Sequence, residues 1–505
     1  AETEGCFQIE SRAQKAMLPK TRPINFYDLV VQVAIVRPGP GVGSMIPVYL
    51  RRREAARRGM PYILPSKDLE PVIGRTYGIP IFQEMIMKIA LIKAGFDATE
   101  ANELRRSIAA FRSANAVNEI GVKLRAGLMK SGLPEDWIDE LCGYFKGFAA
   151  YNFPESHAAS FAMIAYSSAY LKCHHPAEFL CALVNSQPMG FYAIDTLINE
   201  AKRNGVRILP INPNLSAWDA QMEGPMTVRM GFRNVRRIRE EDIRWMNDKN
   251  ERELNDSDIK SKISQDQMHS HFLVLEEERK LKHFSSLYDF VKRTKFSREV
   301  IEVMSMADVF GCFGQDRRHT FWSSISYFSL FEKSNSSQLS LFDEDPQTQS
   351  KNELFQPLSL LETIMSDYKS IGYSTLGNPM AAIRKAVPTL PKMTSLMAKS
   401  EPNNKLVTYA GILTVLQRPP TAKGVAFITA EDEFGSLDFI LKKEIYEEYR
   451  DIIKNNRFLI LHGQIQNRGE GLSVIVRKVE PFMEQVTNDK STSHGATSRM
   501  FGSPF

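Results

Sequence analysis

Long apolar runs and closely spaced cysteines are both missing from this chain of 505 residues. No stretch reaches the roughly 18 consecutive apolar residues of a membrane-spanning helix, so we expect no contact with a membrane. Five cysteines occur, but no two are separated by only two residues. This spacing argues against a zinc ribbon or a disulfide framework, and it favours reduced thiols in the cytoplasm.

The composition that is present is that of an ordinary globular protein, with 43% apolar and 24% charged residues. At about 150 residues per domain, the length allows three or four domains. The net charge of +5 is small, but arginines gather in four places. These are Arg51–Arg53, Arg57–Arg58, Arg105–Arg106, and the set Arg233, Arg236, Arg237 and Arg239. Such clusters suit contacts with phosphate, although solvated helix faces give the same pattern.

The first 210 residues are mostly helical by their apolar periodicity. After Thr99, a candidate N-cap, Leu104 and Ile108 begin an apolar stripe. Arg105 lies on one flank of this stripe, and Arg106 points nearly opposite to it. Further helices are expected over 134–148, 158–184 and 193–204, followed by a short strand over 206–210.

The segment Tyr151–Phe161 has the most distinctive composition. Pro154 bars a helix at its own position, and the run that follows, Ala158–Lys172, reads as a helix. Ser156 and His157 therefore lie at a helix N-terminus, where backbone N–H groups and the helix dipole favour an anion. A serine N-cap beside a structural histidine is the simpler alternative.

The second half of the chain contains polar segments and then a run of strands. Residues 247–282 are charged and lack periodicity, and residues 333–353 have the composition of a linker. From Leu406 the apolar period becomes two, which indicates strands. The candidates are 406–416, 425–429, 437–441, 458–464 and 472–479, with a helix over 442–455. Five short strands with a helix at this place are typical of an OB-fold.

Six segments resemble signatures of the bacterial DNA polymerase III alpha-subunit family, in its error-prone branch. They are GCFQIESR at 5–12, VRPGP at 36–40, IFQE at 81–84, LRR at 104–106, FPESHAASFA at 153–162 and NSQPMGFY at 185–192. The resemblance is nearly continuous over residues 1–245 and looser over 285–330 and 355–482.

The resemblance implies a multidomain chain, with mainly α-helical fingers and a helix-hairpin-helix region followed by a small β-barrel, the OB-fold. The expected domains are 1–225, fingers and adjoining region; 226–330, helix-hairpin-helix DNA-binding region with a charged insertion at 247–282; 331–355, linker with a clamp-binding-like peptide; 356–403, connecting helical segment; 404–482, OB-fold; and 483–505, disordered tail.

The resemblance also implies binding roles for individual residues. Arg105, Arg106, Ser156 and His157 are expected to bind the triphosphate of the incoming nucleotide. Arg233, Arg236, Arg237, Arg239, Arg418 and Lys423 are expected to bind DNA. In the barrel, Phe427, Phe439 and Arg468 offer stacking faces and charge. Strand alternation puts one face of each strand inside, so the alternative is that Phe427 and Phe439 are core residues of the barrel. Gln338, Leu339, Leu341 and Phe342 resemble the peptide by which bacterial polymerases dock on the sliding clamp.

One departure from the family concerns the hairpin turn. Arg237 and Arg239 stand where the family's helix-hairpin-helix carries glycines. A side chain at these positions prevents the close approach of backbone to phosphate, and guanidinium–phosphate pairs are expected in its place.

The family's catalytic carboxylates belong to the palm, which precedes the first of these motifs. The only Asp-x-Asp patterns here, at 256–258 and 343–345, lie in polar segments rather than in apolar strands. The chain begins at Ala1, inside a motif, so we expect it to be truncated at its N-terminus. We predict no catalytic residue and no metal ligand in this chain, and Mg²⁺ is expected only in the intact enzyme.

The expected function is part of an error-prone DNA-directed DNA polymerase, a nucleotidyltransferase of translesion synthesis and DNA repair, with this chain inactive alone. The expected partners are primer–template DNA, dNTPs, the sliding clamp, a separate palm-bearing chain and other translesion factors. A non-catalytic DNA-binding and clamp-tethering fragment of a split polymerase is the alternative, and a decayed copy without function is a third.

Overall fold

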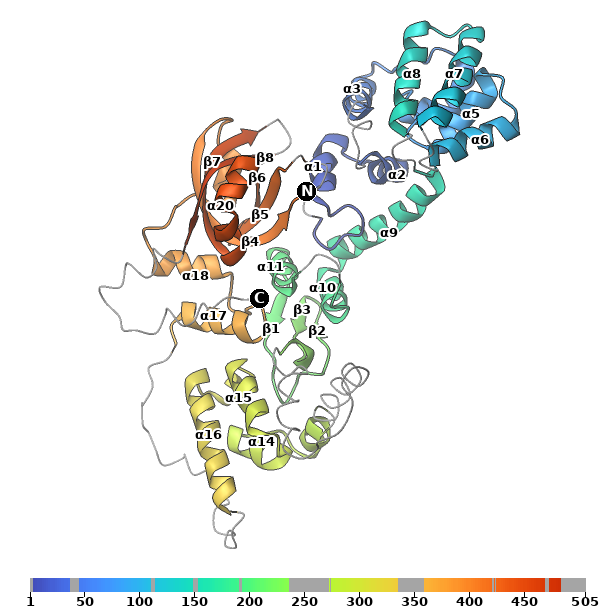
Figure 1. Ribbon diagram of the computed structural model, residues 1–505. Coiled ribbons are helices and arrows are strands. Elements are labelled where there is room, and N and C mark those ends of the chain that lie inside the picture. Colours follow the sequence, from blue (N-terminus) through green and yellow to red (C-terminus); the bar gives the residue numbers. More distant parts are fainter. Residues whose placement is uncertain are drawn as a thin grey trace. The chain divides into compact units, whose positions relative to one another are not determined.

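The computed structural model describes residues 3–36, 45–109, 114–148, 153–189, 193–235, 272, 274–334, 358–419, 422, 424–467 and 472–482. The chain divides into two compact units (Figure 1). The first contains residues 1–173 together with 418–426 and 466–472, and the second contains 174–417, 427–465 and 473–505.

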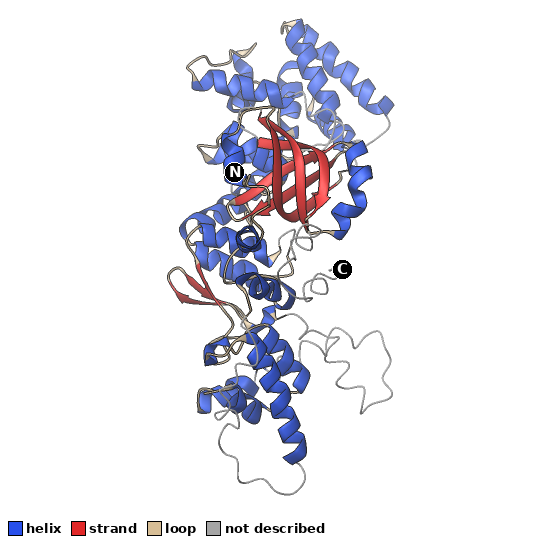
Figure 2. Ribbon diagram, turned by 90° about the vertical axis from the view of Figure 1, so that its left-hand side faces the viewer, coloured by secondary structure: helices blue, strands red, loops and turns tan. Residues whose placement is uncertain are grey.

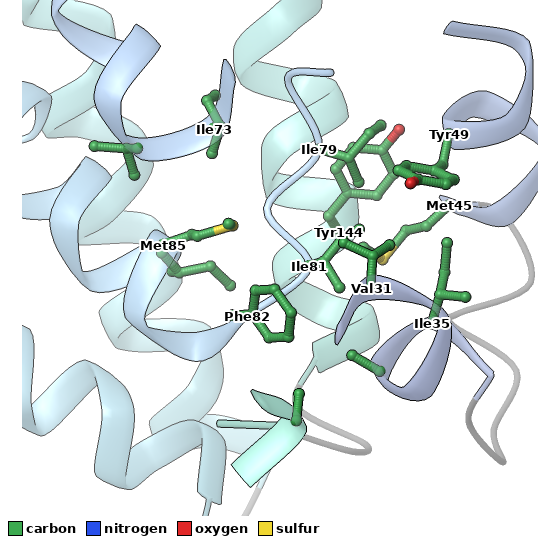
Figure 3. Packing of buried hydrophobic residues seen from close by; sticks show 14 of the residues in the cluster. Val31, Ile35, Met45, Tyr49, Ile73, Ile79, Ile81, Phe82, Met85 and Tyr144 are labelled. Atoms are coloured by element: carbon green, nitrogen blue, oxygen red, sulfur yellow. The ribbon is translucent and has the colours of Figure 1, made fainter. Parts of the chain in front are cut away.

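The first unit is built from helices. They are α1 (Arg12–Thr21), α2 (Phe26–Ile35), α3 (Met45–Arg57), α4 (Glu70–Ile73), α5 (Gln83–Lys93), α6 (Ala98–Ala109), α7 (Ala114–Lys130), α8 (Glu135–Phe148) and α9 (Glu155–His174), with 3-10 turns at Lys67–Leu69 and Gly74–Thr76. One continuous apolar core joins them. Figure 3 shows part of that core, where Val31 from α2 and Met45 and Tyr49 from α3 lie near Tyr144 from α8.

The second unit begins with helices and a small sheet. Its helices are α10 (Pro176–Asn185), α11 (Ile194–Arg203), α14 (Leu287–Thr294), α15 (Arg298–Met306), α16 (Arg317–Ser334), α17 (Leu360–Ser370), α18 (Pro379–Ala386) and α19 (Ser395–Ser400). The sheet has the order β1 (Arg207–Leu209), β3 (Thr227–Arg229), β2 (Gln221–Gly224), with β1 parallel and β2 antiparallel to β3. Phe290, at the centre of this core, packs against Phe284, Phe296 and Phe310.

The chain then closes a five-stranded barrel (Figure 2). Its elements are β4 (Leu406–Gln417), β5 (Ala426–Asp432), β6 (Gly435–Leu441), α20 (Lys443–Asn455), β7 (Phe458–Asn467) and β8 (Leu472–Pro481), in the closed order β4-β5-β6-β8-β7. The parallel pairing of β6 with β8 sets Phe439 opposite Val474. The predicted fold class, helices followed by a small closed barrel, is confirmed.

Two helix boundaries differ from the sequence prediction. The single helix expected over 158–184 is two helices, because Pro176 cannot continue α9 and instead opens α10. The predicted N-cap Thr99 is wrong as well. Asp97 caps α6, since its Oδ1 accepts from the N–H of Glu100 at 2.8 Å and its own N–H donates to Glu100 Oε2 at 3.0 Å.

The last part of the charged segment 247–282 lies within the described residues. Residues 274–281 are helical, and Phe272 and Leu275 are buried in the core of the second unit. The expectation of a non-periodic insertion up to Lys282 is therefore wrong for its last third, where the buried Phe272 and Leu275 and a hydrogen bond from Arg279 to the Ser216 carbonyl hold a charged helix.

Two arginines of α3, Arg52 and Arg53, are bound within the protein and not available for the phosphate contacts that their clustering suggested. Arg52 donates to both carboxylate oxygens of Glu140, at 2.8 and 2.9 Å. Arg53 is buried and forms a two-pronged ion pair with Asp28, at 3.0 and 2.7 Å, while Tyr49 also accepts from it. These side chains hold α3 against α2 and α8.

The Asp28–Arg53 pair gives a stability prediction. We expect Asp28→Ala to lower the free energy of unfolding by about 3–5 kcal/mol, because it leaves a guanidinium buried without its counter-charge. Glu54→Ala, which removes the exposed partner of Arg58 on the same helix, should cost less than about 1 kcal/mol. Hydrogen exchange of the α2 and α3 amides measures the free energy of unfolding of both variants. Equal losses in the two variants would contradict the account.

Candidate nucleotide and nucleic-acid site

The start of α9 is fixed by contacts that join two of the sequence motifs. The N–H of Glu155 donates to Glu84 Oε2 at 3.0 Å, and the Glu155 carboxylate accepts from the Tyr27 hydroxyl at 2.8 Å. The N–H of Gln83 donates to the carbonyl of Phe153 at 3.3 Å. The pattern IFQE at 81–84 and the pattern FPESH at 153–157 therefore meet in one place.

Ser156 and His157 are exposed in the first turn of α9, where the sequence placed them. The imidazole of His157 lies between two phenyl rings, with ring centroids 5.2 Å from Phe153 and 4.0 Å from Phe161. This packing limits the rotamers of His157 beside the N–H groups of the helix start. Such a turn can accept an anionic group.

The N-terminal segment lies along the same helix. The N–H of Phe7 donates to Ser168 Oγ at 3.1 Å, and the Phe7 ring meets Phe161 edge-on at 5.2 Å. Lys172 Nζ donates to the carbonyl of Glu4 at 2.9 Å. A third motif, at 5–12, is thereby attached to α9. Sequence reasoning missed Glu4 and Lys172, because nothing in their local pattern marks them.

The arginine pair of α6 is partly engaged within its own helix. Leu104 is buried, as the predicted stripe requires. Arg105 donates to Asn102 Oδ1 at 3.2 and 3.0 Å, while Arg106 is exposed. Among the described residues, no hydrogen bond or ion pair joins Arg105 or Arg106 to Ser156 or His157. Their shared role at one nucleotide stays a prediction.

Most of the predicted DNA-binding residues are internal or outside the described ranges. Arg233 pairs with Asp219 at 2.7 Å and donates to the carbonyl of Asn185 at 2.9 Å, so it ties the 3-10 turn Phe232–Asn234 to the end of α10 and to the segment before β2. Arg418 is exposed directly after β4. Arg236, Arg237, Arg239, Lys423 and Arg468 lie outside the described residues, and so do the clamp-binding candidates Gln338, Leu339, Leu341 and Phe342.

The two barrel phenylalanines differ in their positions. Phe439 is fully buried and packs on Tyr409, with ring centroids 5.3 Å apart. It is a core residue, and its predicted role as a stacking face is wrong, because strand alternation points it inward. Phe427 is half-buried on β5.

The hairpin between α14 and α15 presents positive charge that the sequence did not single out. Lys295 ends α14 in a left-handed conformation, with φ of 52°, and is exposed, as are Lys292 and Arg298. A left-handed residue at a tight helical hairpin is more often glycine. Lysine in this position adds a charge to the turn.

The described residues do not contain a metal site. No group of three or more histidine, cysteine, aspartate or glutamate side chains comes together within the described ranges. The chemistry of these ranges therefore does not fit a Mg²⁺ centre, and we derive no step through one. Nor does any helix in those ranges combine the length and the apolar character that crossing a membrane requires.

Comparison with known families identifies three segments. Residues 1–132 match the bacterial DNA polymerase III alpha subunit finger domain, residues 266–320 match a helix-hairpin-helix motif, and residues 407–482 match an OB-fold nucleic acid binding domain. The motif at 266–320 contains the α14–α15 hairpin and excludes residues 237–239, which the sequence had aligned with the hairpin glycines.

Similarity over nearly the whole of this chain points to the same family. The chain is 35% identical, over 96% of its length, to a protein of Rhizobium meliloti named error-prone DNA polymerase 1. It is 36% identical, over 98% of its length, to the error-prone DNA polymerase of Hahella chejuensis. It spans 43% and 45% of those two proteins. Among solved structures, asparaginyl-tRNA synthetase from Pyrococcus horikoshii aligns with 19% of this chain and with 23% of its own chain, at 22% sequence identity. The TM-score of this alignment is 0.17, which is too low to support any conclusion about the fold.

These matches define a nucleic-acid-binding chain with polymerase fingers, a helical hairpin and an OB-fold. The chain belongs to the bacterial DNA polymerase III alpha-subunit family, among its error-prone members.

The N-terminal segment that lies along α9 also contains Glu10, whose carboxyl group has a raised pKa. Burial raises the pKa of Glu10 from 4.5 to about 7, with Glu4 adding to the rise and Lys15 opposing it. Between pH 4.5 and about 7 the folded chain thus holds more protons than the unfolded chain. The free energy of unfolding should fall as the pH rises through this window, and it should level off above it.

We expect Glu10→Gln to abolish that fall and to exceed the wild type in stability at pH 8. Glu103→Gln, at an exposed position of α6, is the matched control and should follow the wild type. Thermal unfolding of the three proteins from pH 4.5 to 8 measures the difference. Parallel curves for Glu10→Gln and the wild type would show that Glu10 does not titrate in this range.

Proposed function

We propose that this chain forms the fingers, helix-hairpin-helix and OB-fold portion of an error-prone DNA-directed DNA polymerase that acts in translesion synthesis and DNA repair. Similarity to proteins named error-prone DNA polymerase over nearly the whole chain carries this proposal. The catalytic aspartates and their Mg²⁺ would come from a palm outside residues 1–505, so this chain alone would not polymerise. Its place of action would be the cytoplasm, where bacterial DNA lies.

In this function, the first unit binds the incoming dNTP. The start of α9 supports that role, because Glu84 and Tyr27 anchor it while Ser156 and His157 remain exposed. His157 would donate a hydrogen bond to a phosphate rather than act as a general base. Arg105 and Arg106 would pair with the same triphosphate, as guanidinium groups commonly do.

Primer–template DNA would meet the helical hairpin and the barrel. Lys292 and Lys295 near the hairpin turn, and Arg418 after β4, are exposed cations that support this proposal. Arg236, Arg237, Arg239 and Lys423 would add to the same path. Contacts of this kind give affinity that is independent of sequence and falls with salt.

The segment Gln338–Phe342 would tether the polymerase to the sliding clamp. Leu341 and Phe342 would fill an apolar cleft, worth roughly 3–6 kcal/mol before ordering costs, which suits a reversible tether. A peptide of residues 331–347 should bind the clamp, and its Leu341→Ala, Phe342→Ala form should not. Equal binding by both forms, or by neither, would remove the clamp from the proposal.

The experiment that tests the proposed function is primer extension by a fusion. The portion of the Hahella chejuensis protein that precedes its matched segment is joined to this chain. We expect the fusion to extend a primer. In the fusion, Arg105→Ala or Arg106→Ala should raise the dNTP KM by about 10- to 100-fold and leave the DNA affinity unchanged, because each substitution removes a charge-assisted pair worth about 1.5–3 kcal/mol.

Arg125→Ala is the matched control, because Arg125 is a surface arginine of the same unit that pairs with Glu135 at 3.5 Å. It should leave KM unchanged. A fusion without activity would favour the alternative, a non-catalytic DNA-binding and clamp-tethering fragment. An active fusion whose KM ignores Arg105 and Arg106 would remove them from the nucleotide site.

A further inference from the structure

The turn that carries Arg75 is fixed at both ends. It is the 3-10 turn Gly74–Thr76, and Ile73 and Ile79 on either side of it are fully buried in the core of the first unit (Figure 3). The Thr76 hydroxyl, which is also buried, donates to the carbonyl of Ile79 at 2.6 Å. Arg75 is nevertheless exposed. Its backbone is therefore held in place while its side chain reaches solvent.

The guanidinium of Arg75 lies beside the start of α9. Its Cζ atom is 4.4 Å from the centroid of the Tyr27 ring. The hydroxyl of the same tyrosine donates to the Glu155 carboxylate at 2.8 Å. An aromatic face attracts a guanidinium and limits its rotamers, but it leaves the N–H donors at the edge of the guanidinium open. Tyr27 thus holds a positive charge near the turn that contains Ser156 and His157.

Arg75 differs in its partners from two arginines of α3. Arg52 donates to both carboxylate oxygens of Glu140, and Arg53 donates to both carboxylate oxygens of Asp28. Within the described ranges, no carboxylate forms an ion pair with Arg75, whose contact there is the one with an aromatic ring. A guanidinium that is exposed, carried on a fixed turn and not neutralised by a carboxylate in those ranges can pair with an anionic ligand.

The start of α9 needs such a cation if it is to hold a triphosphate. The carboxylates of Glu84 and Glu155 both lie at this turn. They repel the phosphates of a nucleotide, and the positive end of the helix dipole, at roughly half a charge, does not offset two carboxylates. Among the described residues, no hydrogen bond or ion pair links the α6 arginines to this turn, whereas the contacts of Tyr27 connect Arg75 to it.

We propose that Arg75 is a further nucleotide-binding residue, whose guanidinium pairs with a phosphate of the incoming dNTP beside Ser156 and His157. The inference deepens the proposed function and rests on it. Tyr27 serves as the positioning residue, because its ring supports the guanidinium while its hydroxyl holds the first residue of α9. A phosphate of the primer–template has the same chemistry, but the link to the start of α9 favours the nucleotide.

Kinetics of the fusion described above test this role. Arg75→Ala should raise the dNTP KM by about 10-fold and leave kcat and the Kd for primer–template unchanged, because it removes a charge-assisted pair to the nucleotide. Arg75→Lys keeps the charge but loses the planar pair of donors, so it should raise KM less. Arg125→Ala, in a surface arginine that pairs with Glu135, is the matched control and should leave KM unchanged.

A second measurement reports the contact itself. Phenylglyoxal modifies accessible arginines, and mass spectrometry of the fusion gives the rate of modification at Arg75. We expect dATP to slow this rate several-fold and primer–template alone to leave it unchanged. The rate at Arg125 should not respond to dATP. A residue that only stabilised the fold would show no such protection by the nucleotide.

The opposite results separate the inference from the proposed function. An unchanged KM for Arg75→Ala, in a fusion whose Arg105→Ala form has a raised KM, would refute the role of Arg75 and leave the proposed function standing. Protection by primer–template alone would assign Arg75 to a DNA phosphate and overturn the inference. So would a Tm for Arg75→Ala far below that for Arg125→Ala, which would make Arg75 a structural residue of its turn. A fusion without activity would refute the proposed function, and the inference with it.

Discussion

The anchoring of Glu155 is the contact on which the candidate nucleotide site depends. Its N–H is held by Glu84 and its carboxylate by Tyr27, so both the position and the direction of α9 are set at its first residue. The Arg75 guanidinium lies over the Tyr27 ring, 4.4 Å from its centroid, and burial together with the Glu155 carboxylate raises the pKa of the Tyr27 hydroxyl, which therefore stays a donor. Because the start of α9 is fixed in this way, Ser156 and His157 lie on the exposed side of its first turn.

The architecture was largely predictable, because it follows from local periodicity. Barrel strands with alternating apolar residues and helices with apolar stripes appear where the pattern placed them. Errors arose where two local signals competed. Thr99 and Asp97 are both good caps, and only the reciprocal bonds with Glu100 distinguish them. Pro176 could have kinked a helix or begun one, and it begins α10.

The candidate site was less predictable, since charge in a sequence does not reveal its partner. Arg53 and Arg106 each stand in an arginine cluster, yet Arg53 is buried on Asp28 while Arg106 is exposed. Asp28 lies 25 positions away along the chain, beyond any local pattern. Phe439 likewise looked like a possible stacking face until the barrel closed around it. Lys295 was overlooked because a single lysine at a hairpin turn has no motif.

The central claim is that the chain is the nucleic-acid-binding portion of a polymerase, and hydrogen exchange with and without primed duplex DNA at graded salt tests it most directly. The account predicts protection at the α14–α15 turn and around Arg418, which fades as salt rises because the contacts are with phosphate. Absence of protection at low salt, or protection confined to α3, would contradict it.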